Sequence, residues 1–442
     1  MFTFHRLHKS DVLDSMSALR KALADQDPKA MEELRKQAEA NGMLQGQSVE
    51  QLRQTALASL DQSMQAAAAE DHASPDAYQS HDKLTSLVQS SLNGTLHGTL
   101  HPRSHWGDRL PAVLNLFGQG NAVVWAPTGI SALLEHFKGK PPFKQASARS
   151  RITIPDQCTI AILGDWGADN DHAQRLAALV QQRSPDYVIH LGDIYYSGTE
   201  HECQKFLENW PLKDATGAPV QGRSFALNGN HEMYSEGRYY FTTVLDGFGQ
   251  EASYFSLSNQ RWQFFGLDTA YVPFLISGGA VDASLKCQWD FLVSEINASP
   301  AKRNILLSHN QPVSAFVKET AAGAPLRAEY DKLIAGTRPD AVYGWIFGHE
   351  HRCTIYDDSA LPYKARLLGN GAIPHDPQTE TAPETVKGVT GTKFVAANHG
   401  RLNNGPLAIS TFALLTVDGD RILIDYINED GSVFFKREEW RA

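Results

Sequence analysis

Five short motifs in this sequence carry side chains that could bind metal ions. In chain order they are Gly164–Gly167, Gly192–Tyr196, Asn228–Glu232, Ser308–His309 and Gly348–His351. Each follows a short apolar run that is typical of a buried strand. Polar groups at the carboxyl ends of strands in an α/β sheet gather in one crevice. We therefore expect the five motifs to converge on a single pocket.

The donor types in these motifs suit a pair of metal ions. They offer carboxylate and amide oxygens, a tyrosine hydroxyl and imidazole nitrogens but no cysteine, which favours Zn, Fe or Mn over a soft thiolate site. The candidates are too many for one tetrahedral ion. Two ions that share one carboxylate would use nearly the whole set and leave one histidine for other work. Glycine stands immediately before Asp165, Asp193, Asn230 and His349, where it lets the backbone approach an ion closely.

Each motif by itself also has an ordinary structural explanation. Gly-Asp after a strand is common in turns, and His309 alone would be a hydrogen-bonded core histidine. His349 and His351 are more suggestive, because alternate residues of an extended segment face one side. It is the combination of five motifs, each at a strand end, that indicates a site.

In this order the motifs Gly-Asp-x-Gly, Gly-Asp-x-x-Tyr, Gly-Asn-His-Glu, Ser-His and Gly-His-x-His resemble those of the calcineurin-like metallophosphoesterases. Within that superfamily they look like the purple acid phosphatase branch. The resemblance covers residues 155–370 well and the C-terminal hairpins loosely, and it does not reach residues 1–145. It implies an α/β, four-layer sandwich of two β-sheets flanked by helices, with a dinuclear metal centre at the strand ends.

The resemblance also implies which residues bind the two ions. Asp193 would bridge them, metal one would take Asp165, Tyr196 and His351, and metal two would take Asn230, His309 and His349.

The tyrosine ligand is implied by a departure from the family at Gly167, where many metallophosphoesterases have a histidine that binds metal one. The site would be one ligand short unless Tyr196 supplies it. The alternative is that Tyr195 and Tyr196 are core aromatics. A phenolate ligand implies Fe(III) at this position, with Fe, Zn or Mn as the second ion.

The activity implied by the resemblance is hydrolysis of a small phosphate ester. Two ions about 3.5–4 Å apart clamp the attacking and phosphoryl oxygens, and a metal-activated hydroxide attacks phosphorus. His231, next to Asn230, is the implied general acid for the leaving alcohol. Glu232 could orient His231 or could be a surface carboxylate. Asp171 and His172 could reach the substrate, although a helix start explains them equally well.

The residues that would contact the phosphate differ from those of the family. Plant and animal purple phosphatases carry further histidines soon after the fourth motif, whereas the stretch Asn310–Phe316 contains none. Other candidates for this contact are Asn310, Tyr234, Arg238 and His399. The turn-rich loop Thr390–Gly405 is a candidate rim element.

Three functions remain open from the sequence. The first is a phosphomonoesterase with an Fe(III)–M(II) centre. The second is a phosphodiesterase acting on cyclic nucleotides or phospholipid head groups, because the same metals serve both reactions. The third is a non-catalytic, metal-bound regulatory protein. The presence of every implied ligand argues against the third.

Strands and helices alternate from Ile152 onward, which indicates an α/β layered catalytic domain over residues 146–442. Two β-hairpins are predicted, with turns at Ser258–Gln260 and Asp418–Gly419.

Residues 1–145 read instead as a mainly helical region whose role the sequence leaves open. Asp27 followed by Pro28 predicts one helix start, and the capping-box spacing at Ser48 predicts another. A short strand is expected at Ala122–Trp125.

Composition and charge exclude several classes of protein. Fifty acidic against 40 basic residues give a net charge of -10, which argues against nucleic acid as the partner. No apolar run is long enough for a transmembrane span, and Met1–Ser10 does not resemble a secretory signal. The 4 cysteines are scattered, so we expect free thiols and a cytoplasmic protein. The oligomeric state is left open.

Overall fold

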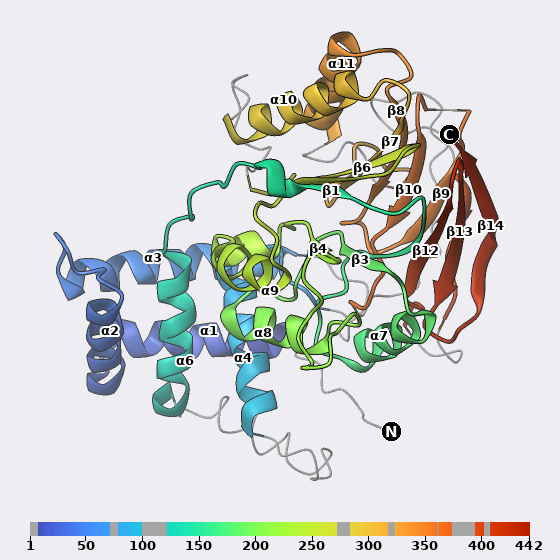
Figure 1. Cartoon of the computed structure of the whole chain (residues 1–442). Helices are drawn as coiled ribbons and strands as arrows, with labels where there is room; N and C mark the ends of the chain where they lie inside the picture. Colours follow the sequence, from blue (N-terminus) through green and yellow to red (C-terminus); the bar gives the residue numbers. More distant parts are fainter. Residues whose placement is uncertain are drawn as a thin grey trace. The chain divides into compact units, whose positions relative to one another are not determined.

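The computed structural model divides the chain into two units, which we describe separately. The first comprises Met1–Lys140 with Tyr234–Glu236, and the second comprises Pro141–Met233 with Gly237–Ala442. The residues that the structure describes are 8–70, 78–99, 122–271, 283–316, 323–359, 361–373, 394–401 and 407–442. Figure 1 shows both units, coloured along the chain.

The first unit is built from α-helices whose starts follow from the sequence. The helices are α1 (Lys9–Ala24), α2 (Pro28–Ala40), α3 (Val49–Ala69), α4 (Lys83–Thr99) and α6 (Ala122–His136). The Asp27 side chain accepts the N–H groups of Lys29 and Ala30 at the start of α2. Ser48 and Gln51 form a capping box at the start of α3. Both predicted helix starts are therefore confirmed.

The strand expected at Ala122–Trp125 is wrong, because these residues begin helix α6. A short apolar run fits a strand and a buried helix equally well, and its periodicity cannot separate them. The helix extends to His136, so the apolar run is only its first part.

The second unit contains two β-sheets. The first has the strand order β1-β5-β6-β7-β8-β10-β9-β11, and the second has the order β14-β13-β12-β2-β3-β4. The eight-stranded sheet contains β1 (Arg151–Thr153), β5 (Phe255–Ser258), β6 (Trp262–Leu267), β7 (Arg303–Ser308), β8 (Val342–Phe347), β9 (Cys353–Tyr356), β10 (Lys364–Leu368) and β11 (Phe394–Ala397). The six-stranded sheet contains β2 (Gln157–Leu163), β3 (Tyr187–His190), β4 (Ser224–Ala226), β12 (Thr411–Asp418), β13 (Arg421–Asn428) and β14 (Val433–Arg441).

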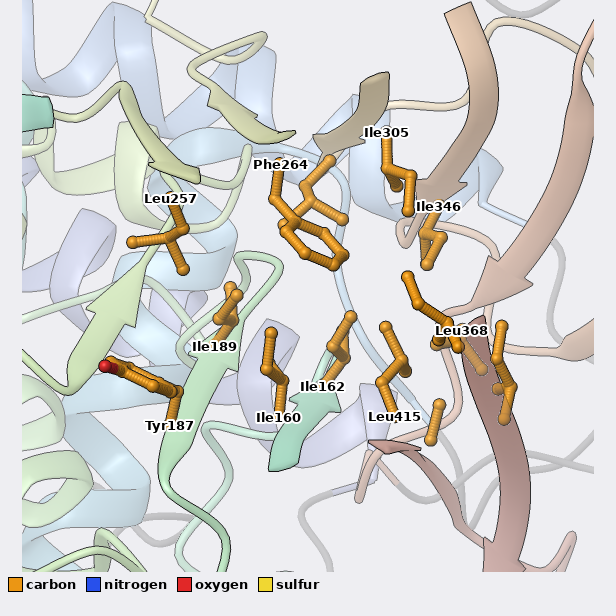
Figure 2. Close-up of a cluster of buried hydrophobic side chains, with 14 of the residues drawn as sticks. Ile160, Ile162, Tyr187, Ile189, Leu257, Phe264, Ile305, Ile346, Leu368 and Leu415 are labelled. Atoms are coloured by element: carbon orange, nitrogen blue, oxygen red, sulfur yellow. The ribbon is translucent and has the colours of Figure 1, made fainter. Parts of the chain in front are cut away.

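Alternate side chains of one strand face different cores. Ile160 and Ile162 of β2 belong to the core between the sheets, whereas Ala161 and Leu163 belong to the cluster on the outer face. Figure 2 shows the inner core, where side chains from both sheets, such as Ile162 and Phe264, point toward one another. The two sheets therefore pack face to face.

Helices cover the outer face of each sheet. Those on the six-stranded sheet are α7 (Asp171–Arg183), α8 (Glu200–Asn209) and α9 (Leu245–Phe248), and those on the eight-stranded sheet are α10 (Ala283–Ala298) and α11 (Gly323–Gly336). Figure 1 shows α10 and α11 on one side of the sheets and α7 and α8 on the other. The predicted four-layer α/β sandwich is confirmed.

Each strand that precedes one of the five motifs pairs in parallel with at least one neighbour. In one sheet β2, β3 and β4 are parallel, and in the other β6, β7, β8 and β10 are parallel. Their carboxyl ends therefore lie along one edge of each sheet, where polar loops can meet. Each of the five motifs begins at such an end.

Both predicted hairpins are confirmed, because β5 pairs antiparallel with β6 and β12 pairs antiparallel with β13. The 4 cysteines are free thiols. Within the described part of the chain, none of the helices combines the length and apolarity that crossing a membrane requires.

Candidate metal centre

Carboxylate and imidazole groups from four motif loops meet in two overlapping clusters. One cluster contains Asp165, Asp193 and His351, and the other contains Asp193, His309 and His349. In each cluster the candidate ligand atoms lie within 4.8 Å of one another. Asp193 is common to both, which is the arrangement that a bridging carboxylate requires.

A tyrosine hydroxyl lies at the centre of the first cluster. The Tyr195 hydroxyl oxygen is 2.9 Å from Asp165 Oδ1, 2.9 Å from Asp193 Oδ2 and 2.9 Å from His351 Nε2. A hydroxyl has one proton and can donate it to one acceptor at a time. Several lone pairs therefore converge on one small volume, and a cation would satisfy them better than one proton does.

This hydroxyl belongs to the residue before the expected tyrosine, Tyr196. The backbone carbonyl of Tyr196 lies 2.5 Å from Nδ1 of His231. Tyr195 and Tyr196 lie in a turn, so the regular alternation of a strand does not set the directions of their side chains. The strand β3 ends at His190, and the direction of each tyrosine is decided in the loop that follows.

The second cluster surrounds Nε2 of His309. This nitrogen is 2.9 Å from Asn230 Oδ1, 3.2 Å from Asp193 Oδ1 and 3.2 Å from His349 Nδ1. Nδ1 of His309 lies 3.1 Å from the Leu191 carbonyl, so Nδ1 carries the proton and Nε2 is left with a lone pair. Asn230, His309 and His349 are thus brought together, and their donor atoms suit a cation.

Three of the candidate ligands have a left-handed backbone. The φ angles are 57° at Asp165, 74° at Asp193 and 74° at His349. Non-glycine residues rarely adopt this region, and such strain is concentrated at functional sites. Neighbouring glycines provide the necessary space, because a Cβ at Gly348 would lie 2.7 Å from Asp165 Oδ2.

The position of the missing family histidine has no room for a side chain. A Cβ at Gly167 would lie 2.5 Å from Cα of Ile194 and 3.0 Å from the carbonyl oxygen of Asp193. The first two motif loops therefore pack so closely that only glycine fits at this position.

The buried carboxylates of Asp165 and Asp193 repel each other electrostatically. The pKa of the Asp165 carboxyl is raised well above its usual value, first by burial and then by the Asp193 charge. Burial also acts to raise the pKa of Asp193, but His309, His231 and His349 bring it below the ordinary range. Because nearby positive charge favours ionised carboxylates, metal ions would stabilise both groups in their charged form.

His231 is fixed beside the two clusters. Its backbone N–H donates to Asp193 Oδ1 at 3.0 Å, and its Nδ1 faces the Tyr196 carbonyl, which can only accept. Nδ1 therefore carries a proton, and Nε2 lies 3.9 Å from Asp193 Oδ2. The ring is 2% exposed and its centroid is 4.4 Å from that of Tyr195.

Glu232 is fully buried, so the alternative that it is a surface carboxylate is wrong. Its Oε2 accepts the N–H groups of Asp193 at 3.1 Å and Gly229 at 3.2 Å. The carboxylate therefore connects the loop of the bridging aspartate to the loop of Asn230. Its place inside a motif was visible in the sequence, but its burial was not.

A sixth loop that sequence reasoning missed packs against Asp165. After β10, the N–H of Gly371 donates to the Gly164 carbonyl at 2.9 Å, and the N–H of Ala372 donates to the Asp165 carbonyl at 3.1 Å. The sequence did contain a signal for this loop. Gly369-Asn-Gly371 directly follows an apolar run, as the other motifs do.

The remaining candidates were expected to contact the substrate. Asp171 is the first residue of α7, which Asn170 caps, and His172 lies 2.8 Å from a carboxylate oxygen of Glu429. The helix-start explanation therefore accounts for Asp171.

Asn310 is buried, and its Oδ1 accepts a hydrogen bond from Thr269. For Tyr234, Arg238 and His399 a phosphate contact stays a prediction. Half of the proposed rim loop Thr390–Gly405, residues 390–393 and 402–405, lies outside the described residues.

Comparisons with solved structures give several matches. GAP50, the anchor in the inner membrane complex of Plasmodium, is 14% identical with a TM-score of 0.46, over 64% of this chain and 89% of that chain. PhoD is 11% identical with a TM-score of 0.43, over 65% of this chain and 69% of that chain. A predicted phosphoesterase from Streptococcus pneumoniae is 10% identical with a TM-score of 0.29, over 65% of this chain and 98% of that chain. A comparison with curated proteins gives no match.

A family comparison agrees with the geometry of the site. Residues 158–353 match the family described as Calcineurin-like phosphoesterase. This segment begins in β2 and ends at the start of β9, so it includes all five motifs. Residues 158–353 are therefore similar to a calcineurin-like phosphoesterase domain, and Asp and His groups at the strand ends could hold metal ions.

Proposed function

We propose that this protein hydrolyses phosphate esters at a dinuclear metal centre, and that its substrates are phosphomonoesters. The observation that carries the proposal is the Tyr195 hydroxyl at 2.9 Å from two carboxylates and an imidazole. Phenolate, carboxylate and imidazole donors together suit Fe(III). Metal one is assigned to Asp165, Tyr195 and His351, with Tyr195 in place of the tyrosine expected from the sequence.

Metal two is assigned to Asn230, His309 and His349, with Asp193 as the bridge. The second ion is Fe, Zn or Mn. Support comes from the protonated Nδ1 of His309, which leaves Nε2 available to an ion. When bound, the ions supply positive charge for the phosphoryl oxygens and activate the attacking water.

The chain itself supplies the proton for the leaving group. His231 is held through Nδ1 by the Tyr196 carbonyl, so its Nε2 is the nitrogen that can deliver a proton. The adjacent Asp193 Oδ2 lies 3.9 Å from this Nε2. We assign His231 as the general acid that protonates the departing alcohol.

Metal analysis with a visible spectrum tests the proposal. The purified protein should contain iron and show a phenolate-to-iron charge-transfer band. The Tyr195→Phe variant should lose the band, whereas the matched control Tyr196→Phe should keep it. An active, colourless protein that contains only Zn or Mn would refute the Fe(III) assignment.

Substrate preference separates the monoesterase from a diesterase. Rates with p-nitrophenyl phosphate and bis(p-nitrophenyl) phosphate should favour the monoester. A preference for the diester would replace the phosphomonoesterase with the phosphodiesterase alternative. No hydrolysis of either ester by the metal-loaded protein would favour a regulatory role.

A further inference from the structure

The loop after β6 supplies none of the ligands assigned above, yet it lies between two loops that do. Strand β6 ends at Leu267, and the next two residues, Asp268 and Thr269, are 1% and 2% exposed. Two adjacent polar side chains buried at a strand end need hydrogen-bond partners. Their partners identify what this loop does.

Asp268 binds the loop that carries Asn230. Its Oδ1 accepts the N–H groups of Ala270 at 3.1 Å and Tyr271 at 2.9 Å, which fixes the carboxylate in its own loop. The Asn228 amide then donates to Oδ1 at 3.2 Å and approaches Oδ2 at 3.4 Å. Asn228 follows β4 in the six-stranded sheet, so this contact joins the ends of the two sheets.

Thr269 binds the loop that carries His309. The Thr269 hydroxyl donates to Asn310 Oδ1 at 3.0 Å and accepts the Asn310 backbone N–H at 3.0 Å. Asn310 directly follows His309. Two hydrogen bonds between one hydroxyl and one residue restrict both the position and the rotation of that residue.

We propose that Asp268 and Thr269 are positioning residues for the second metal site. One side chain holds the loop of Asn230, the other holds the loop of His309, and the peptide between them sets the separation of the two ligands. Among the described ligand loops, these contacts reach the loops of Asn230 and His309, so the pair acts more directly on metal two than on metal one. The inference rests on the proposed function, because it takes Asn230 and His309 as ligands.

The test measures binding of Zn²⁺ to the full chain after its metals are removed by chelation. Calorimetric titration of the wild type should resolve two binding events. In Thr269→Val, which keeps the shape and loses the hydroxyl, one event should weaken at least tenfold and the other should stay within twofold. Thr269→Ser keeps the hydroxyl and should restore both affinities.

Asn228→Ala provides a second route to the same result, through Asp268 rather than Thr269. It should weaken one Zn²⁺ site and not the other, and it replaces Thr269→Val if that variant does not fold. Equal weakening of both sites, or no weakening of either site, would overturn the positioning role. A wild type that binds fewer than two ions would instead overturn the proposed function.

Discussion

His190 should make the second unit less stable in mild acid, although its side chain is not a metal ligand. It is fully buried on β3, and burial lowers its pKa from 6.5 to about 3. Its Nε2 accepts the backbone N–H of Trp166 at 3.3 Å, so a proton on Nε2 would face another N–H. The ring is therefore neutral in the folded protein.

The sign and size of the effect follow from proton binding. Below pH 6.5 the unfolded chain binds a proton at this histidine, whereas the folded chain does so only near pH 3. Stability is therefore complete above pH 6.5 and is lost progressively as the pH falls toward 3. Between pH 7.5 and pH 5 the loss is about 2 kcal/mol, because each pKa unit corresponds to about 1.4 kcal/mol.

Urea unfolding followed by tryptophan fluorescence measures this loss. EDTA is present throughout, because acid would otherwise release metal ions and add their contribution. The wild type should lose about 2 kcal/mol more than His190→Gln between pH 7.5 and pH 5. His201→Gln, which changes an exposed histidine, is the matched control and should follow the wild type. The same pH dependence in His190→Gln and wild type would refute the reasoning.

Three further predictions concern the site. Asp193→Asn should lower activity at least 100-fold and reduce metal content, because it removes a charge shared by both clusters; activity within tenfold of the wild type would contradict the bridge. His231→Ala should slow hydrolysis of esters with poor leaving groups more than esters with good ones, and equal losses on both would exclude a general acid. Glu232→Ala should reduce the unfolding free energy by about 2–6 kcal/mol, because two buried N–H groups lose their acceptor. Thermal or urea unfolding measures this loss, and Glu232→Gln, which keeps an acceptor oxygen, should lose less; an equal loss in both would contradict the role of the acceptor.

The elements that position the site were predictable because their signals are local. The side chains of the apolar run Cys158–Leu163 are by themselves enough to predict a buried strand, and β2 includes this run. The turn at Asp418–Gly419 likewise predicts the hairpin that joins β12 and β13. The apolar run at Ala122–Trp125 was misread, because its composition allows a strand and a helix alike.

The sequence also indicated the kinds of donors and the strand ends that carry them. Asp165, Asp193, His309, His349 and His351 each directly follow, or lie just beyond, a recognisable apolar run, and the structure brings them together in two clusters. Parallel pairing explains this, because it aligns strand ends from distant parts of the chain at one edge.

Only the tertiary structure decided which side chains of a loop face the site. Residue order alone does not show whether Tyr195 or Tyr196 faces the site. The direction of each side chain depends on the loop backbone, which includes a φ of 74° at Asp193. The contacts of Glu232, and of Asp268 and Thr269, join residues about 40 positions apart in the chain or cross between sheets. Such contacts arise from packing, so local patterns determined the strands and the donor types, and the packed loops determined their directions and partners.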